Sequence, residues 1–299
     1  MANIEGTYHS FWTKNYVPDI SEHKLTKWGS EKYRLAAFAL SFFMARRVYG
    51  VNKLVTDNYG KYLLCDLLEL PYDEVSYELE AFQWITGPLW AMGKIVAYGI
   101  MGEEKKRFAH IDDDFILYRR VDDSGEATFQ HVEDANVPSY APTWEKVMSE
   151  THTLPYFYSE NHRERKFAQN ASIVTFNDNQ HLREFSNATL AHLYANREYY
   201  KGYHLCWTHN LILEQYGLWA YCEHHGIKSN NLFNDLKDAH TRKGVGMTHI
   251  WGAASNEAMK AKLMRALFLV APKQYHIIEE AFKEKPEPDY VDILKWPRL

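Results

Sequence analysis

The sequence predicts an α/β fold with a mostly parallel central sheet flanked by helices. The main observation is that strand-like and helical segments alternate, with a strand at 53–57, a turn at 58–60 and a helix at 61–68. This alternation is typical of parallel sheets, whose strands are joined by crossover helices. A chain of 299 residues with 46% hydrophobic residues is also long and apolar enough to bury a substantial core.

We expect a single domain over residues 1–299, because neither internal repeats nor low-complexity tracts divide the chain. Segment 136–165 contains three prolines and is expected to be an irregular loop or lid. Residues 284–288 are expected to form a surface linker. Further strands are expected at 8–12, just after 71–75, and at 115–121, 127–132 and 170–178. Further helices are expected at 31–47, 89–101, 180–196, 209–225 and 256–270.

Charge and composition exclude several classes of protein. The net charge of −5 argues against a dedicated nucleic-acid binder, which usually has a basic face. Three cysteines are too few for a disulfide framework and fit reduced thiols in the cytoplasm. The sequence contains no run of about 18 apolar residues, so it predicts no membrane span. No signal peptide is evident. We therefore expect a cytoplasmic protein.

The most informative stretch is a run of three aspartates, Asp112, Asp113 and Asp114, between the apolar segments 108–111 and 115–118. Burying three adjacent carboxylates without partners would cost several kcal/mol. They therefore either face water in a charged turn between two strands or bind a cation. In an extended chain Asp112 and Asp114 point to the same side, roughly 6–7 Å apart at Cα, and Asp113 to the other. Hard oxygen ligands of this kind suit Mg²⁺ or Mn²⁺.

Three separated stretches together resemble the glycosyltransferases of the GT-A fold. Residues 110–114, after a helix that carries Lys94, resemble the DXD site of these enzymes, and 249–252 are similar to the C-terminal His-x-x-Gly of metal-dependent members. Residues 170–173, followed by Glu214 and Gln215, resemble an uncharacterised bacterial group common in Bacteroidetes. The resemblance spans roughly residues 53–272. It implies a GT-A-like domain with a nucleotide-binding half at about 1–135 and an acceptor-side, C-terminal helical half at about 136–299.

The resemblance also implies an activity and its ligands. The donor would be a UDP- or GDP-sugar, held through Mn²⁺ or Mg²⁺, and the acceptor a carbohydrate or another hydroxyl compound. Such a hexosyltransferase would fit surface-polysaccharide synthesis. Asp112, Asp114 and His249 would be the metal ligands. The resemblance also implies that Lys94, Asp112 and Asp113 lie near the donor, and that Asp57 contacts its base or ribose.

The resemblance implies that Asp114 and Glu214 are the catalytic residues. An inverting enzyme needs a base beside the acceptor hydroxyl, and Glu214 is the candidate. A retaining enzyme needs no such base, and the alternative for Glu214 is an ordinary helical glutamate.

The sequence departs from the family pattern at two positions of the candidate site. Asp113 stands where related enzymes often have a glycine. Ser255 stands where the family has a phosphate-binding lysine, for which Lys260 and Lys262 are candidate substitutes.

Three alternatives compete with a glycosyltransferase. Cys206, His209 and Cys222 suggest a zinc site, but a single helix over 209–225 would put Cys222 about 20 Å along the axis from His209, at ~1.5 Å per residue. The aspartate run also fits a metal-dependent phosphohydrolase, although that chemistry usually needs further His/Asp pairs. The third alternative is a catalytically inactive, sugar-binding relative.

Overall fold

A computed structural model of the protein confirms the α/β fold with a mostly parallel sheet. Among the described residues the central sheet has seven strands in the order β10-β6-β9-β4-β1-β2-β3. Every neighbouring pair is parallel except the two pairs that β9 makes with β4 and β6. The strands are β1 (Gly6–Phe11), β2 (Val51–Thr56), β3 (Glu74–Ser76), β4 (Phe108–Ile111), β6 (Ala127–Phe129), β9 (Ile173–Phe176) and β10 (Ser229–Asn231). The structure describes residues 3–13, 30–85, 87, 89–135, 140–158, 167–201, 205, 207–241, 246–250, 254 and 256–283.

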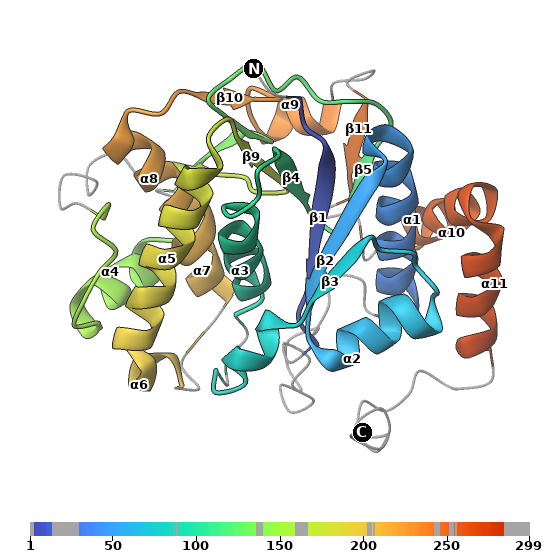
Figure 1. The fold of residues 1–299 in the computed structure, drawn as a ribbon, viewed down its shortest axis with the longest axis horizontal. Helices are drawn as coiled ribbons and strands as arrows, with labels where there is room; N and C mark the ends of the chain where they lie inside the picture. The colour runs from blue at the N-terminus through green and yellow to red at the C-terminus, as the bar shows by residue number, and fades with distance from the viewer. Residues whose placement is uncertain are drawn as a thin grey trace.

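Helices cover both faces of the sheet (Figure 1). On one side lie α1 (Glu31–Tyr49), α10 (Glu257–Val270) and α11 (Pro272–Ala281). On the other lie α3 (Ala91–Met101) and α5 (Asn179–Ala195). Because successive side chains of a strand point to opposite faces, β1 contributes to both layers. Its Phe11 packs on Phe38 of α1, with ring centroids 5.0 Å apart, whereas Tyr8 lies in the core beneath α3.

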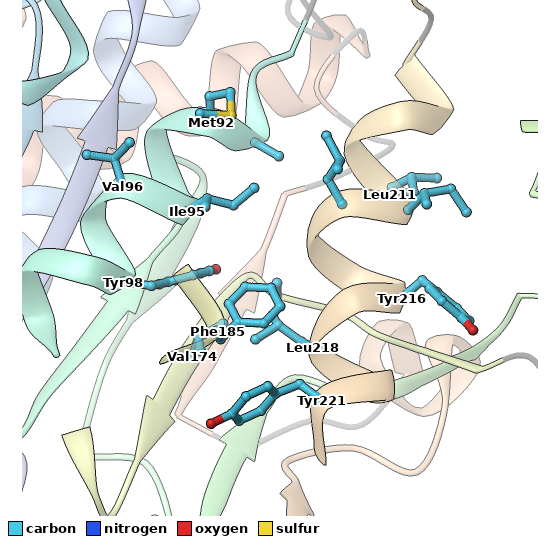
Figure 2. Close-up of a cluster of buried hydrophobic side chains, with 14 of the residues drawn as sticks. Met92, Ile95, Val96, Tyr98, Val174, Phe185, Leu211, Tyr216, Leu218 and Tyr221 are labelled. Atoms are coloured by element: carbon cyan, nitrogen blue, oxygen red, sulfur yellow. The ribbon is translucent and has the colours of Figure 1, made fainter. Parts of the chain in front are cut away.

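A second helical layer contains a helix from 207 to 225 that carries Glu214. It consists of α7 (Trp207–Asn210), a π-helical segment (Leu211–Tyr216) and α8 (Gly217–His225). In Figure 2, Ile95 and Tyr98 of α3 point toward the 207–225 helix, whose Leu218 and Tyr221 point toward α3, and Phe185 of α5 lies between them. Burial of this shared core fixes the two helices relative to each other. Two chain segments that are far apart in the sequence therefore meet beside the sheet.

The remaining elements are short. They include the two-stranded ribbon of β5 (Phe115–Leu117) with β11 (Met247–His249) and that of β7 (Val132–Asp134) with β8 (Phe167–Gln169). The others are α2 (Asn58–Lys61), a π-helical segment (Tyr62–Leu67), a 3₁₀ helix (Glu78–Phe82), α4 (Ala141–Glu150), α6 (Arg197–Tyr200) and α9 (Leu236–Thr241).

Most predicted elements form, but three expectations were wrong in detail. Segment 136–165 is not irregular throughout, because α4 forms within it with Pro142 in its first turn, where a missing N–H costs nothing. The strand predicted at 115–121 ends at Leu117. The strand predicted at 127–132 is divided into β6 and β7. The linker predicted at 284–288 lies outside the described residues.

His192 of α5 makes stability depend on pH. Its side chain is 2% exposed, with Nδ1 2.6 Å from the Thr153 carbonyl oxygen and Nε2 2.7 Å from the Tyr200 hydroxyl. Burial lowers the pKa of His192 to about 4, although the hydrogen bond to Thr153 opposes the shift. The unfolded chain, with a pKa near 6.5, therefore binds more protons than the native state between these values, and stability falls as the pH drops from about 6.5 towards 4.

We expect this residue alone to cost about 2 kcal/mol of unfolding free energy between pH 7 and pH 4.5. Urea unfolding at the two pH values should show a smaller loss in His192→Gln than in the wild type. His276→Gln, which changes an exposed histidine, serves as the control. An identical pH dependence in His192→Gln and the wild type would contradict the assignment.

Candidate functional site

The three aspartates form the turn that joins β4 to β5. The Phe115 N–H donates to the Asp112 carbonyl oxygen at 3.1 Å, which closes the turn. The Asp112 N–H donates to the Ser172 carbonyl oxygen at 2.9 Å. From α1, the Ser41 hydroxyl lies 3.2 Å from the Asp112 carbonyl oxygen and 3.0 Å from that of Phe115. The turn is thus held by the neighbouring chain segment at Ser172 and by α1 on one face of the sheet, which limits how far its carboxylates can move.

Asp112, Asp114 and His249 come together as the sequence predicts. One ligand atom from each of the three lies within 4.8 Å of the other two. His249 reaches the aspartates because β11 pairs antiparallel with β5, in a register that sets His249 opposite Phe115. His249 Nε2 is 3.4 Å from Asp114 Oδ1, and Asp114 is fully buried. Asp113 points elsewhere, with Oδ2 3.3 Å from Arg34 Nε, as the alternation predicts.

These residues fit a divalent cation. Two carboxylates and an imidazole are a donor set that Mg²⁺ or Mn²⁺ accepts. Apart from its 3.4 Å approach to Asp114 Oδ1, His249 Nε2 is buried without a hydrogen-bond partner among the described residues, so it is available as a ligand beside that carboxylate. The zinc alternative has no such support, because no cluster around Cys222 and His209 is found in the described part of the chain, and Cys206 lies outside it.

Lys94 of α3 lies beside this cluster. Its Nζ is 2.6 Å from Asp112 Oδ1 and 3.2 Å from Glu214 Oε1, and it donates to the Ala171 carbonyl oxygen at 3.2 Å. Burial alone would lower the pKa of Lys94, but the charges of Asp112 and Glu214 outweigh it and raise the pKa. Lys94 is therefore a buried ammonium ion between two carboxylates.

Glu214 lies in the π-helical segment of the 207–225 helix and is fully buried. Its Oε1 accepts a hydrogen bond from the Tyr98 hydroxyl at 2.7 Å, besides the contact with Lys94. Burial raises the pKa of Glu214 to about 7, while the Lys94 charge opposes the rise. π-helical segments often occur at functional sites, because the extra residue in the turn redirects a side chain.

Sequence reasoning missed two further residues near Glu214. Tyr98 lies four residues after Lys94, so both side chains are on one face of α3, and this spacing is the signal that could have found it. His110 packs against Tyr98, with ring centroids 5.4 Å apart, and its Nε2 is 3.0 Å from the Ser10 hydroxyl. Burial holds the pKa of His110 well below its usual value.

Asp57 is not part of this group. It caps α2 by accepting the Gly60 N–H at 2.8 Å, and it also accepts the N–H and hydroxyl of Thr13, at 2.9 and 2.7 Å. Burial raises the pKa of Asp57, against the effect of these hydrogen bonds. The structure gives Asp57 a role in joining β1 to α2, and its contact with a base or ribose stays a prediction.

The structure gives no support to Lys260 or Lys262 as the phosphate-binding lysine that Ser255 replaces. Lys260 Nζ is 2.8 Å from Glu257 Oε1 on the same helix, and Lys262 is exposed. Ser255 itself and Trp251-Gly252 lie outside the described residues.

The fold and the site together define a class of protein: an α/β protein with a candidate cation site directly after a central strand. Within it, the chain belongs to the family described as "Family of unknown function (DUF6734)", whose model matches residues 7–281. No curated protein matches the sequence.

Two solved structures are similar at low identity. The apo form of mouse xyloside xylosyltransferase 1 has a TM-score of 0.40 and 11% identity, over 83% of this chain and 98% of that one. The PaToxG glycosyltransferase has a TM-score of 0.39 and 10% identity, over 97% of this chain and 86% of that one.

No helix among the described residues is both long and apolar enough to cross a membrane.

Proposed function

We propose that this protein is a metal-dependent glycosyltransferase of the GT-A type, which transfers a sugar from a UDP- or GDP-sugar to an acceptor hydroxyl. The observation that carries the proposal is the convergence of Asp112, Asp114 and His249 within 4.8 Å. Asp112 directly follows the carboxyl end of β4, and open α/β sheets bind their ligands outside the carboxyl ends of their strands. A nucleotide diphosphate held through a cation suits such an edge.

In this proposal Asp112, Asp114 and His249 hold Mn²⁺ or Mg²⁺. The ion would neutralise charge on the departing diphosphate. Lys94, which contacts both Asp112 and Glu214, adds a buried positive charge next to the metal site and so favours negative charge on the leaving group. Glu214 is the proposed proton acceptor, since a pKa of about 7 suits general-base chemistry at neutral pH.

Finer parts of the proposal rest on the sequence resemblance alone. They are the hexosyltransferase subclass, a role in surface-polysaccharide assembly and the Bacteroidetes-type group. The proposed division into a donor half at about 1–135 and an acceptor half at about 136–299 has the same basis. In it, Asp113 and Asp57 belong to the donor half of the chain. A cytoplasmic location is proposed from the cysteine content instead.

A donor screen tests the proposal. Thermal unfolding should be measured with UDP-, GDP- and CMP-sugars, each with and without Mn²⁺. We expect one nucleotide sugar to raise Tm by several degrees only when Mn²⁺ is present, because a ligand that binds the native state stabilises it. That donor should then release free nucleotide in the presence of an acceptor.

Other outcomes would point to the alternatives. Metal-dependent hydrolysis of a phosphoester that contains no sugar would favour a phosphohydrolase. Donor binding without turnover would favour an inactive sugar-binding relative. Equal stabilisation with and without Mn²⁺ would contradict metal dependence.

A further inference from the structure

The ammonium group of Lys94 is placed between a candidate metal ligand and a second carboxylate. Its Nζ is 2.6 Å from Asp112 Oδ1 and 3.2 Å from Glu214 Oε1, so a small rotation of the side chain exchanges one close contact for the other. The lysine side chain is 9% exposed and that of Glu214 is fully buried. Water therefore does little to compensate either charge.

We propose that Lys94 is a built-in counter-ion of the metal site, which neutralises Asp112 in the absence of a divalent cation and shifts its ion pair to Glu214 when the cation binds. The inference rests on the proposed function only in assuming that the cation binds at Asp112, Asp114 and His249. Lys94 is then a positioning residue, because it acts through Asp112 and Glu214.

Charge explains why the shift should occur. An ammonium ion and a divalent cation repel each other, so close contact of both with one carboxylate is unfavourable at low dielectric constant. Lys94 cannot simply leave, because a buried Glu214 without a positive partner would be costly. A flexible four-carbon stem lets the ammonium group move without movement of the backbone.

The surroundings favour Glu214 as the receiving group. The Tyr98 hydroxyl donates to Glu214 Oε1 at 2.7 Å, which holds in place the carboxylate that Lys94 also contacts. The Ala171 carbonyl oxygen, 3.2 Å from Nζ, is a fixed acceptor that the lysine can keep in both positions. Only the contact with Asp112 then has to be given up.

A double-mutant cycle tests the inference by Mn²⁺ binding alone, followed by the EPR signal of free Mn²⁺. Lys94→Met keeps the length of the side chain but removes the competing charge, so we expect Mn²⁺ to bind about tenfold more tightly. Glu214→Gln removes the alternative partner and leaves Lys94 on Asp112, so we expect binding about fivefold weaker. In the Lys94→Met background, Glu214→Gln should change the affinity by less than about twofold.

The cycle separates a shift of the ion pair from a general effect of charge. If Glu214 acted only as one more negative charge near the ion, its removal would weaken Mn²⁺ binding equally in both backgrounds, and this result would overturn the inference. Unchanged or weaker binding by Lys94→Met would also overturn it. Should Lys94→Met fail to fold, Glu214→Gln alone decides, because unchanged Mn²⁺ affinity there contradicts the inference.

Two matched variants serve as controls. Lys94→Arg keeps the positive charge and should stay within about threefold of the wild type; binding as tight as that of Lys94→Met would contradict the inference. Lys53→Met removes a half-buried lysine, which pairs with Glu74 and Glu104 outside the site, and should leave Mn²⁺ affinity unchanged. If neither the wild type nor Lys94→Met binds Mn²⁺, the inference fails, whereas donor-dependent release of nucleotide tests the proposed function separately.

Discussion

The double variant Asp112→Asn/Asp114→Asn is expected to lose Mn²⁺-assisted binding of the nucleotide sugar while staying folded. Asparagine keeps the shape of aspartate but removes two negative charges from the three side chains that converge within 4.8 Å. A hard divalent cation depends on such charges, so we expect the donor Kd in Mn²⁺ to rise at least about 100-fold. Isothermal titration with the donor, in Mn²⁺ and in EDTA, measures the effect.

Asp113→Asn is the matched control for this experiment. Asp113 stands between the two candidate ligands in the sequence, but its carboxylate pairs with Arg34. Its replacement should therefore leave the Mn²⁺-dependent affinity nearly unchanged. Unaltered donor binding by the double variant would count against the proposed site, as would an equally large loss in Asp113→Asn.

Gly102→Ala is expected to destabilise the protein by about 3 kcal/mol. Gly102 is the C-cap residue of α3 and lies against Arg183 of α5. A Cβ at this position would lie 2.5 Å from the backbone nitrogen and 2.7 Å from the Cα of Arg183, and it would also meet the Arg183 Cβ. Because backbone atoms cannot rotate away, α5 would have to move off α3 and open the core between them.

Urea unfolding of Gly102→Ala and Gly93→Ala checks this prediction. Gly93 lies on the same helix, but a Cβ there would be 3.3 Å from the Ser10 hydroxyl and 3.4 Å from its Cβ, so only small adjustments are needed. Alanine also favours a helix over glycine by ~1 kcal/mol, which offsets part of any strain. Equal stability of the two variants would show that the α3–α5 approach is not tightly packed.

Much of the fold was predictable because it depends on local pattern. The strand and helix at the 53–68 segment follow directly from the order of apolar and turn residues. Strand β10, by contrast, is Ser-Asn-Asn, which has no intrinsic preference for a strand. It forms by pairing with β6, and helix α4 forms because Trp144 is buried against Tyr216 and Tyr158. Such tertiary pairings leave no local signal.

In the candidate site, too, some features follow from local sequence and others depend on tertiary packing. The alternation of Asp112 and Asp114 is a local property and was predicted, and the family resemblance pointed to His249. The contact of Lys94 with Glu214 depends on the packing of the 207–225 helix against α3, which no spacing in the sequence encodes. The resemblance named both residues, but not that they share one ion pair.

The β5–β11 ribbon also links occupancy of the candidate metal site to the stability of the chain around it. Asp114 and His249 are far apart in the sequence and are held together at one end of this short ribbon. An ion shared by the two side chains would act as a reversible cross-link that closes a long loop of chain. Occupancy would then tighten the loop between Asp114 and His249 against local opening, so resistance to proteolysis would report the loaded state without any substrate.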